Sequence, residues 1–285
     1  MSFIAESPQF VLTGLVGGFA IGLTGMGGGA VLTPVLLALG VPPSTAVGSD
    51  LVASLFIKPV AGSVHASAKT VRWDLVRWLC VGSIPAALAG SLLSARFAKS
   101  GEATLKRAIG LTLVVAATAM VFRAIVAART ARASVGLGRG AVGRGSVGRG
   151  SGGVADSGST SLIIASPARP FITVVLGIVG GFLVGLTSVG SGSLMVVVMS
   201  LLYPRLAPKA LVGTDIVQAV PLVAAAALGH VLLGNFRLGL TGALLIGGIP
   251  GAWVGARLSS GRATKVVRPA LITLLVATGC KLVLA

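Results

Sequence analysis

Charged residues are scarce in this chain of 285 residues, because only 10% are Asp, Glu, Lys or Arg while 54% are hydrophobic. A soluble domain carries about 25% charged residues. Long apolar runs, such as Leu75–Leu93 and Leu238–Val254, approach the roughly 20 residues with which an α-helix crosses a bilayer. This composition excludes an ordinary soluble domain and predicts an all-α integral membrane protein. A transmembrane β-barrel would show short alternating segments instead.

Acidic residues are scarcer still, with six Asp and Glu against 23 Lys and Arg, for a net charge of +17. Such an excess can indicate nucleic-acid binding. Here the basic residues lie between the apolar runs and in one Gly/Arg-rich tract, which is typical of the cytoplasmic loops of membrane proteins. We therefore expect the lipid bilayer as a partner and no nucleic acid.

Cysteine is nearly absent, and Cys80 and Cys280 both lie in apolar segments without metal-binding spacing. We expect two small buried hydrophobic residues, no metal and no cofactor. The sequence also has no GxxxxGK[ST] phosphate-binding loop, so ATP could drive this chain only through another protein. The N-terminus MSFIAESPQF has no basic region of a signal peptide, so we expect the first apolar segment to be retained.

Glycine, by contrast, is abundant, and much of it lies in two related apolar stretches. Residues 14–32 read GLVGGFAIGLTGMGGGAVL, and residues 177–195 read GIVGGFLVGLTSVGSGSLM. VGSD at residues 47–50 returns as VGTD at residues 212–215, an offset of 165. The chain is thus predicted to hold two homologous membrane repeats, residues 1–127 and 170–285. Residues 128–169, rich in Gly and Arg, are predicted to be a disordered tether between them.

Each repeat is predicted to contain a glycine-broken element of two arms followed by three spans, about eight to ten membrane segments in all. In the first repeat the arms meet at Thr24–Gly29, the spans cover about 44–65, 74–93 and 108–126, and a basic loop covers 96–107. If the two arms form a hairpin, the repeats are inverted; if they make one crossing, the repeats are parallel. Only the hairpin places most Lys and Arg residues on one side. We therefore predict inverted repeats with a cytoplasmic linker and both termini outside.

The ordered set of motifs resembles the TauE/SafE sulfite-exporter-like permeases. It comprises the duplicated glycine stretch, VGSD or VGTD, a His-containing span, and then IPAALAGS at 84–91 or IPGAWVGA at 249–256. The resemblance covers both predicted repeats and omits the linker. It implies a multi-pass transporter of a bacterial inner membrane for sulfite, organosulfonates or related small anions. Because substrates vary within the family, the resemblance does not fix the ligand.

The glycine breaks are the first candidate binding site. A helix interrupted inside a membrane exposes backbone N–H and C=O groups that lipid cannot satisfy, and a helix starting after the break directs N–H groups at an anion. An alternative is that the glycines only allow close helix packing, which the spacing of Gly14, Gly18 and Gly22 fits well. The break residues expected to surround the substrate are Thr24, Gly27, Gly28, Gly29, Thr187, Ser188, Gly190, Ser191, Gly192 and Ser193.

Polar side chains within the apolar spans are the second group of candidates. Lys58 is a cation in mid-span, which is usually functional, although a lysine can also extend its amine toward the membrane surface. Asp50 and Asp215 occupy matched positions, either for ion or proton coupling or as helix N-terminal caps. His65 and His230 are further coupling candidates, with a structural role favoured, and Gln218 is a candidate substrate ligand.

These residues favour a secondary transporter of a small anion, working by alternating access, with protons and sodium as candidate coupling ions. Two alternatives remain: a non-transporting membrane scaffold that uses its linker to recruit a partner, and an intramembrane aspartyl protease. The motifs GSD and GTD lack the tyrosine and second glycine of such proteases, so we expect no enzyme. Direction of transport, coupling ion and assembly into a homo-oligomer are left open by the sequence.

Overall fold

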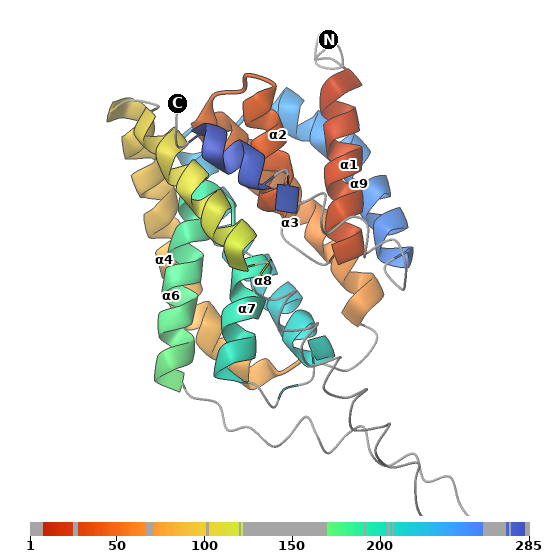
Figure 1. Ribbon diagram of the computed structural model, residues 1–285, viewed down its shortest axis with the longest axis vertical. Helices are drawn as coiled ribbons and strands as arrows, with labels where there is room; N and C mark the ends of the chain where they lie inside the picture. The colour runs from red at the N-terminus through yellow and green to blue at the C-terminus, as the bar shows by residue number, and fades with distance from the viewer. Residues whose placement is uncertain are drawn as a thin grey trace, which may run out of the picture.

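A computed structural model gives the fold of the chain (Figure 1). It describes residues 8–24, 28–66, 71–100, 103–119, 121, 170–190, 192–203, 206, 208–258, 272–273 and 275–282. In this part of the chain the regular secondary structure is entirely helical. The predicted linker, residues 128–169, lies outside the described residues.

The described part of the first half holds two short elements and four longer helices. They are α1 (Pro8–Thr24), the short 3₁₀ helix η1 (Gly28–Ala30), α2 (Leu32–Ala38), α3 (Pro43–Ala66) and α4 (Trp73–Ser100), followed by a helix over residues 103–119. The second half has the same order, with α6 (Pro170–Thr187), α7 (Ser193–Leu202), α8 (Pro208–Leu232) and α9 (Leu238–Arg257). Both glycine stretches therefore join a longer helix to a shorter one.

The predicted basic loop over residues 96–107 is wrong. Helix α4 continues through Arg96 to Ser100, and residues 103–107 are already helical. The segment consists mainly of Ala, Arg, Lys, Leu and Glu, all strong helix formers, and its positive charge did not prevent helix formation.

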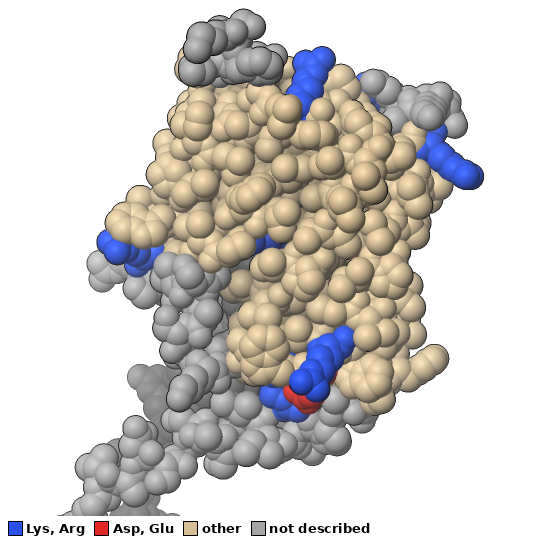
Figure 2. Space-filling model, turned by 180° about the vertical axis from the view of Figure 1, so that it is seen from behind, with Lys and Arg blue, Asp and Glu red and all other residues tan. Residues whose placement is uncertain are grey.

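Apolar side chains cover the outside of the molecule. Within the described ranges, four helical segments are long and apolar enough to cross a membrane, namely Trp73–Phe97, Pro170–Thr187, Gly213–Leu232 and Leu238–Arg257, and Pro8–Leu23 is a shorter apolar helix. Large hydrophobic residues such as Val16, Val179 and Ile246 are exposed, and Figure 2 shows a broad face without charge, with Lys and Arg mostly at its edges. Helix α3, in contrast, buries polar side chains. This distribution identifies an integral membrane protein.

Glycine backbones hold the two halves together. Helix α1 packs along α9, and α6 packs along α4, so the first helix of each half lies against a helix of the other half (Figure 1). A Cβ atom on Gly18 would overlap the carbonyl of Gly248, and one on Gly181 would overlap that of Ser83. Corresponding contacts occur along both pairs: Gly14 with Leu244, Gly22 with Ala252, Gly177 with Leu79, and Gly185 with Ala87. The close-packing interpretation is therefore correct for these glycines.

Two matched hydrogen bonds define how α3 and α8 are oriented. The N–H of Arg237, after the end of α8, donates to the hydroxyl of Ser49 near the start of α3 (3.2 Å). The N–H of Arg72, after the end of α3, donates to the hydroxyl of Thr214 near the start of α8 (3.1 Å). Helices α3 and α8 therefore run antiparallel where they pack together. Inverted repeats require this orientation, whereas repeats related by an axis along the membrane normal would leave these helices parallel.

The close helix contacts can be tested with two Gly→Ala substitutions. Gly18→Ala should destabilise the protein by about 1–3 kcal/mol, because its methyl group forces α1 away from the backbone of α9. Gly242→Ala on α9 is the control, because a Cβ there meets nothing within 4 Å. We expect a lower midpoint of thermal unfolding in detergent for Gly18→Ala alone; equal midpoints for the two variants would contradict the packing.

Candidate functional site

The second glycine stretch forms a break between α6 and α7. The chain turns through left-handed backbone at Ser188 (φ 61°), Gly190 (φ 118°) and Gly192 (φ 102°). The hydroxyl of Thr187 donates to the carbonyl of Leu183 (2.8 Å) and accepts the N–H of Val189 (3.3 Å). The Thr187 hydroxyl thus provides hydrogen-bond partners for one carbonyl and one N–H group at the end of α6. Helix α7 then begins directly after Gly192, in the interior of the protein.

The two breaks meet inside the molecule. Gly29, in η1 of the first half, lies so close to Ser188 that a Cβ atom on it would overlap the Ser188 carbonyl. Only glycine leaves room for this contact. Gly28 belongs to the same 3₁₀ turn. Gly27, Ser191 and the side chains of Thr24 and Ser193 lie outside the described part of the structure.

Asp50 lies beside this junction and is completely buried. Its Oδ2 atom accepts hydrogen bonds from the hydroxyls of Thr33 (2.7 Å) and Ser188 (2.8 Å), and its Oδ1 atom accepts one from Ser54 (3.1 Å). The donors come from α2, from α3 and from the break of the other half. A buried carboxylate needs such donors, because neither lipid nor apolar side chains can replace water around it.

Lys58 brings a positive charge into the same region. It follows Asp50 by two helical turns on α3, and its residue surface is only 7% exposed. Lys58 interacts electrostatically with Asp215 on α8 and with Asp50. Asp215 itself is 2% exposed. Among the described residues, these three are the buried Asp, Glu, Lys and Arg side chains, and they lie where α3 and α8 pack together.

The two halves supply different chemistry to this cluster. The hydroxyl donors around Asp50 are Thr33, Ser54 and Ser188. In the sequence of the other repeat the counterparts of these three residues are Val196, Ala219 and Gly25, and none of them has a hydroxyl group. The counterpart of Lys58 is Val223. The two repeats therefore offer different side chains at matched positions of the sequence.

Helix capping by the two aspartates does not fit the structure. Asp50 and Asp215 each lie two turns inside their helices, α3 and α8, and both are buried. The neighbouring hydroxyls of Ser49 and Thr214 have a related role instead, because they accept the N–H groups of Arg237 and Arg72 at the starts of α9 and α4.

Two other predicted residues lie in helix contacts. The amide nitrogen of Gln218 donates to the hydroxyl of Ser83 (2.9 Å), which joins α8 to α4. His230 is fully buried, and its Nε2 atom lies 3.0 Å from the carbonyl of Gly185 in α6, so the imidazole donates there. The structure thus places His230 in a packing contact; the side chain of His65 is not among those described.

Sequence reasoning missed two donors to Asp50. Ser54 follows Asp50 by four residues, so helical spacing alone could have identified it. Thr33 reaches Asp50 from α2, and no local pattern indicates that contact. No group of three or more His, Cys, Asp or Glu residues that could hold a metal ion occurs in the described ranges.

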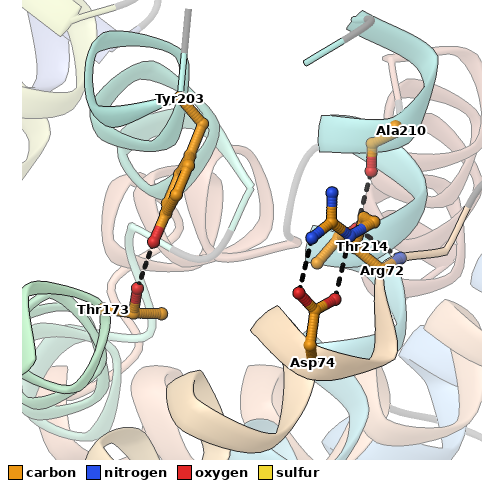
Figure 3. Close-up of polar contacts among 6 residues, drawn as sticks. All are labelled: Arg72, Asp74, Thr173, Tyr203, Ala210 and Thr214. Atoms are coloured by element: carbon orange, nitrogen blue, oxygen red, sulfur yellow. Dashed lines mark hydrogen bonds and ion pairs between the residues drawn. The ribbon is translucent and has the colours of Figure 1, made fainter. Parts of the chain in front are cut away.

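A second polar group lies at the end of the molecule where α6 begins (Figure 3). Arg72 and Asp74 form an ion pair with two hydrogen bonds, and the hydroxyls of Thr173 and Tyr203 are 2.6 Å apart. The hydrogen bond to Asp74 raises the pKa of the Arg72 guanidinium. At the opposite end the repeat has Gly239, Phe10 and Gly40 in place of Asp74, Thr173 and Tyr203. The two ends of the molecule therefore differ.

Comparison with known proteins places these features among membrane transporters. Residues 10–282 match the family model described as "Sulfite exporter TauE/SafE". The chain is 32% identical to the "Probable membrane transporter protein YjnA" of Bacillus subtilis (strain 168), over 97% of this chain and 100% of the relative. It is 25% identical to YunE of the same organism, which has the same description, over 99% of this chain and 98% of the relative. No solved structure matches.

Substitutions at Ser188 separate its hydrogen bond from its backbone conformation. Ser188→Ala should lower stability by about 1.5–3 kcal/mol, because Asp50 loses a charge-assisted donor. Ser188→Gly loses the same donor, but glycine adopts φ 61° without the roughly 1–2 kcal/mol that other residues incur. We expect the thermal midpoint of the glycine variant to lie between those of the alanine variant and wild type; a glycine variant less stable than the alanine variant would contradict this assignment.

Proposed function

Because the chain belongs to the sulfite exporter TauE/SafE family, we propose that this multi-pass membrane transporter carries a small anion such as sulfite or an organosulfonate. Family membership and two relatives described as probable membrane transporters support transport itself. The anion is inferred from the chemistry of the interior. The protein is proposed to lie in a bacterial inner membrane.

Lys58 carries this proposal. A buried ammonium group within a membrane is costly and is usually kept for function. It lies on the helix whose Asp50 accepts the Ser188 hydroxyl, so the positive charge and the second glycine break belong to one region. Helix α7 starts at that break, and the first N–H groups of a helix favour a negative ligand. An oxyanion with several acceptor oxygens suits an ammonium, hydroxyls and N–H groups together.

The placement of the breaks supports a proposal of alternating access. Both glycine stretches meet in the interior, and α3 and α8 run antiparallel through it. In transporters built from inverted repeats, the substrate site lies at the interface of the repeats near the bilayer midplane. We infer that the two halves are inverted and that rearrangement around this junction opens the site to either side in turn.

The alternative functions fit the structure less well. An aspartyl protease needs two carboxyl groups in hydrogen-bond contact. Here both oxygens of Asp50 accept hydroxyl groups, which leaves this carboxylate engaged in a structural network. A scaffold that only recruits a partner would not need a lysine and two aspartates buried at the junction of its repeats. We therefore favour transport.

A flux screen tests the proposal. Purified protein in liposomes should take up at least one of sulfite, sulfate, thiosulfate, taurine, methanesulfonate and sulfoacetate. Lys58→Ala should lower the initial rate at least about tenfold, because losing one charge-assisted contact removes about 1.5–3 kcal/mol. Lys106→Ala, on the helix over residues 103–119, serves as the matched control and should keep its flux. Unchanged flux in Lys58→Ala would remove Lys58 from the site.

The proposed orientation has its own test. A protease site inserted in the linker, residues 128–169, should be cut only when the protease reaches the cytoplasmic face of the membrane. Cleavage of intact spheroplasts from outside would reverse the topology. Deleting residues 130–165 should leave anion flux intact, whereas a scaffold that acts through its linker would lose its function.

A further inference from the structure

The central cluster contains more negative than positive charge. Asp50 and Asp215 bring two carboxylates and Lys58 brings one ammonium, so the fully ionised cluster has a net charge of −1. All three groups lie in the interior, where an uncompensated charge is destabilising by several kcal/mol. A monovalent anion entering this region would make the net charge more negative, at −2. The proposed substrate therefore needs an accompanying positive charge.

The surroundings of the two aspartates indicate which carboxyl group can change its charge. Asp50 accepts three hydroxyl donors at 2.7–3.1 Å, an arrangement that stabilises the ionised form. Asp215 is buried as well, and it lies on α8, which packs against the helix that carries Lys58. Asp215 also interacts with Lys58, so its charge and the charge of a bound anion act on the same ammonium group. Asp215 is thus the carboxyl group suited to alternate between two states.

We propose that the substrate anion replaces Asp215 as the counter-charge of Lys58, and that Asp215 takes up one proton as it does so. This step rests on the proposed function. One negative charge enters with the anion and one is removed by protonation, so the net charge of the cluster stays the same. For a monovalent anion the complete cycle moves one proton and one anion in the same direction, and no net charge crosses the membrane.

The other ionisable groups near these helices lie apart from this exchange. His230 shares α8 with Asp215 but follows it by fifteen residues, and its imidazole contacts Gly185. Arg72 and Asp74 pair with each other at the end where α6 begins. Ser83 and Gln218, from α4 and α8, add uncharged groups to the interior. Among the described residues, the change of charge therefore falls on the cluster of Asp50, Lys58 and Asp215.

Methanesulfonate is the probe that tests the proposal, because it keeps its single negative charge over the working pH range and carries no proton itself. Liposomes containing the full chain and the internal pH dye pyranine are held at a fixed membrane potential with valinomycin and potassium. Wild-type protein should acidify the lumen by one proton for each anion taken up. A gradient of one pH unit, alkaline inside, should give about tenfold accumulation.

Variants of Asp215 test whether this residue is the group that takes up the transported proton. Asp215→Asn should lose both acidification and accumulation, whereas Asp215→Glu, which keeps a carboxyl group, should retain them. Asp74→Asn is the matched control for an Asp→Asn change and should transport protons as wild type does. Size-exclusion profiles and thermal midpoints identify any variant that fails to fold, and the wild-type stoichiometry tests the coupling without any variant.

Each other outcome has a definite meaning. Methanesulfonate accumulation that depends on a sodium gradient and not on the pH gradient would overturn proton coupling. Methanesulfonate flux that is driven by the membrane potential without acidification of the lumen would overturn it as well. A folded Asp215→Asn that still moves one proton per anion would overturn the role of Asp215. Transport of sulfite but not methanesulfonate would overturn the inference and leave the proposed function standing. Absence of flux for every anion in the screen would overturn the proposed function as well.

Discussion

A carboxylate inside a membrane protein has to find all its hydrogen-bond donors within the protein, and Asp50 shows how strongly this constrains the architecture. Its three donors come from α2, α3 and the break between α6 and α7. Ser188 reaches Asp50 only because the chain adopts left-handed backbone there and because Gly29 lets the two breaks touch. The burial of one acidic group thus fixes the distance between two elements that lie far apart in the sequence.

Glycine has two separate tasks in this molecule. Along α1 and α6 its regular spacing lets each helix lie directly against the backbone of a helix from the other half, as at Gly18 and Gly181. At the breaks it allows either a positive φ, as at Gly190 and Gly192, or contact with another loop, as at Gly29. Each glycine stretch therefore contains residues for close helix packing and residues for the break, and neither interpretation alone describes the whole stretch.

The sequence was informative where a single chain segment carries the signal. The apolar runs predicted α3 and the start of α4 closely, and the buried lysine stood out because Lys58 interrupts an apolar run. It was misleading at residues 96–107, where positive charge indicated a loop but helix propensity prevailed. It could not reveal the contact between Thr33 and Asp50, or the pairing of α1 with α9, because these depend on how helices from separate segments assemble.

That exchanged pairing has a mechanical consequence. Helix α9 packs against α1 and α3, and α4 packs against α6 and α8, while α3 and α8 meet each other. The two closely packed bundles therefore do not coincide with the two repeats of the sequence, since each bundle contains helices from both. The seam between the bundles runs along α3 and α8, which carry Asp50, Lys58 and Asp215. Any sliding or rocking at this seam would change the spacing of those charges while leaving the glycine contacts within each bundle intact.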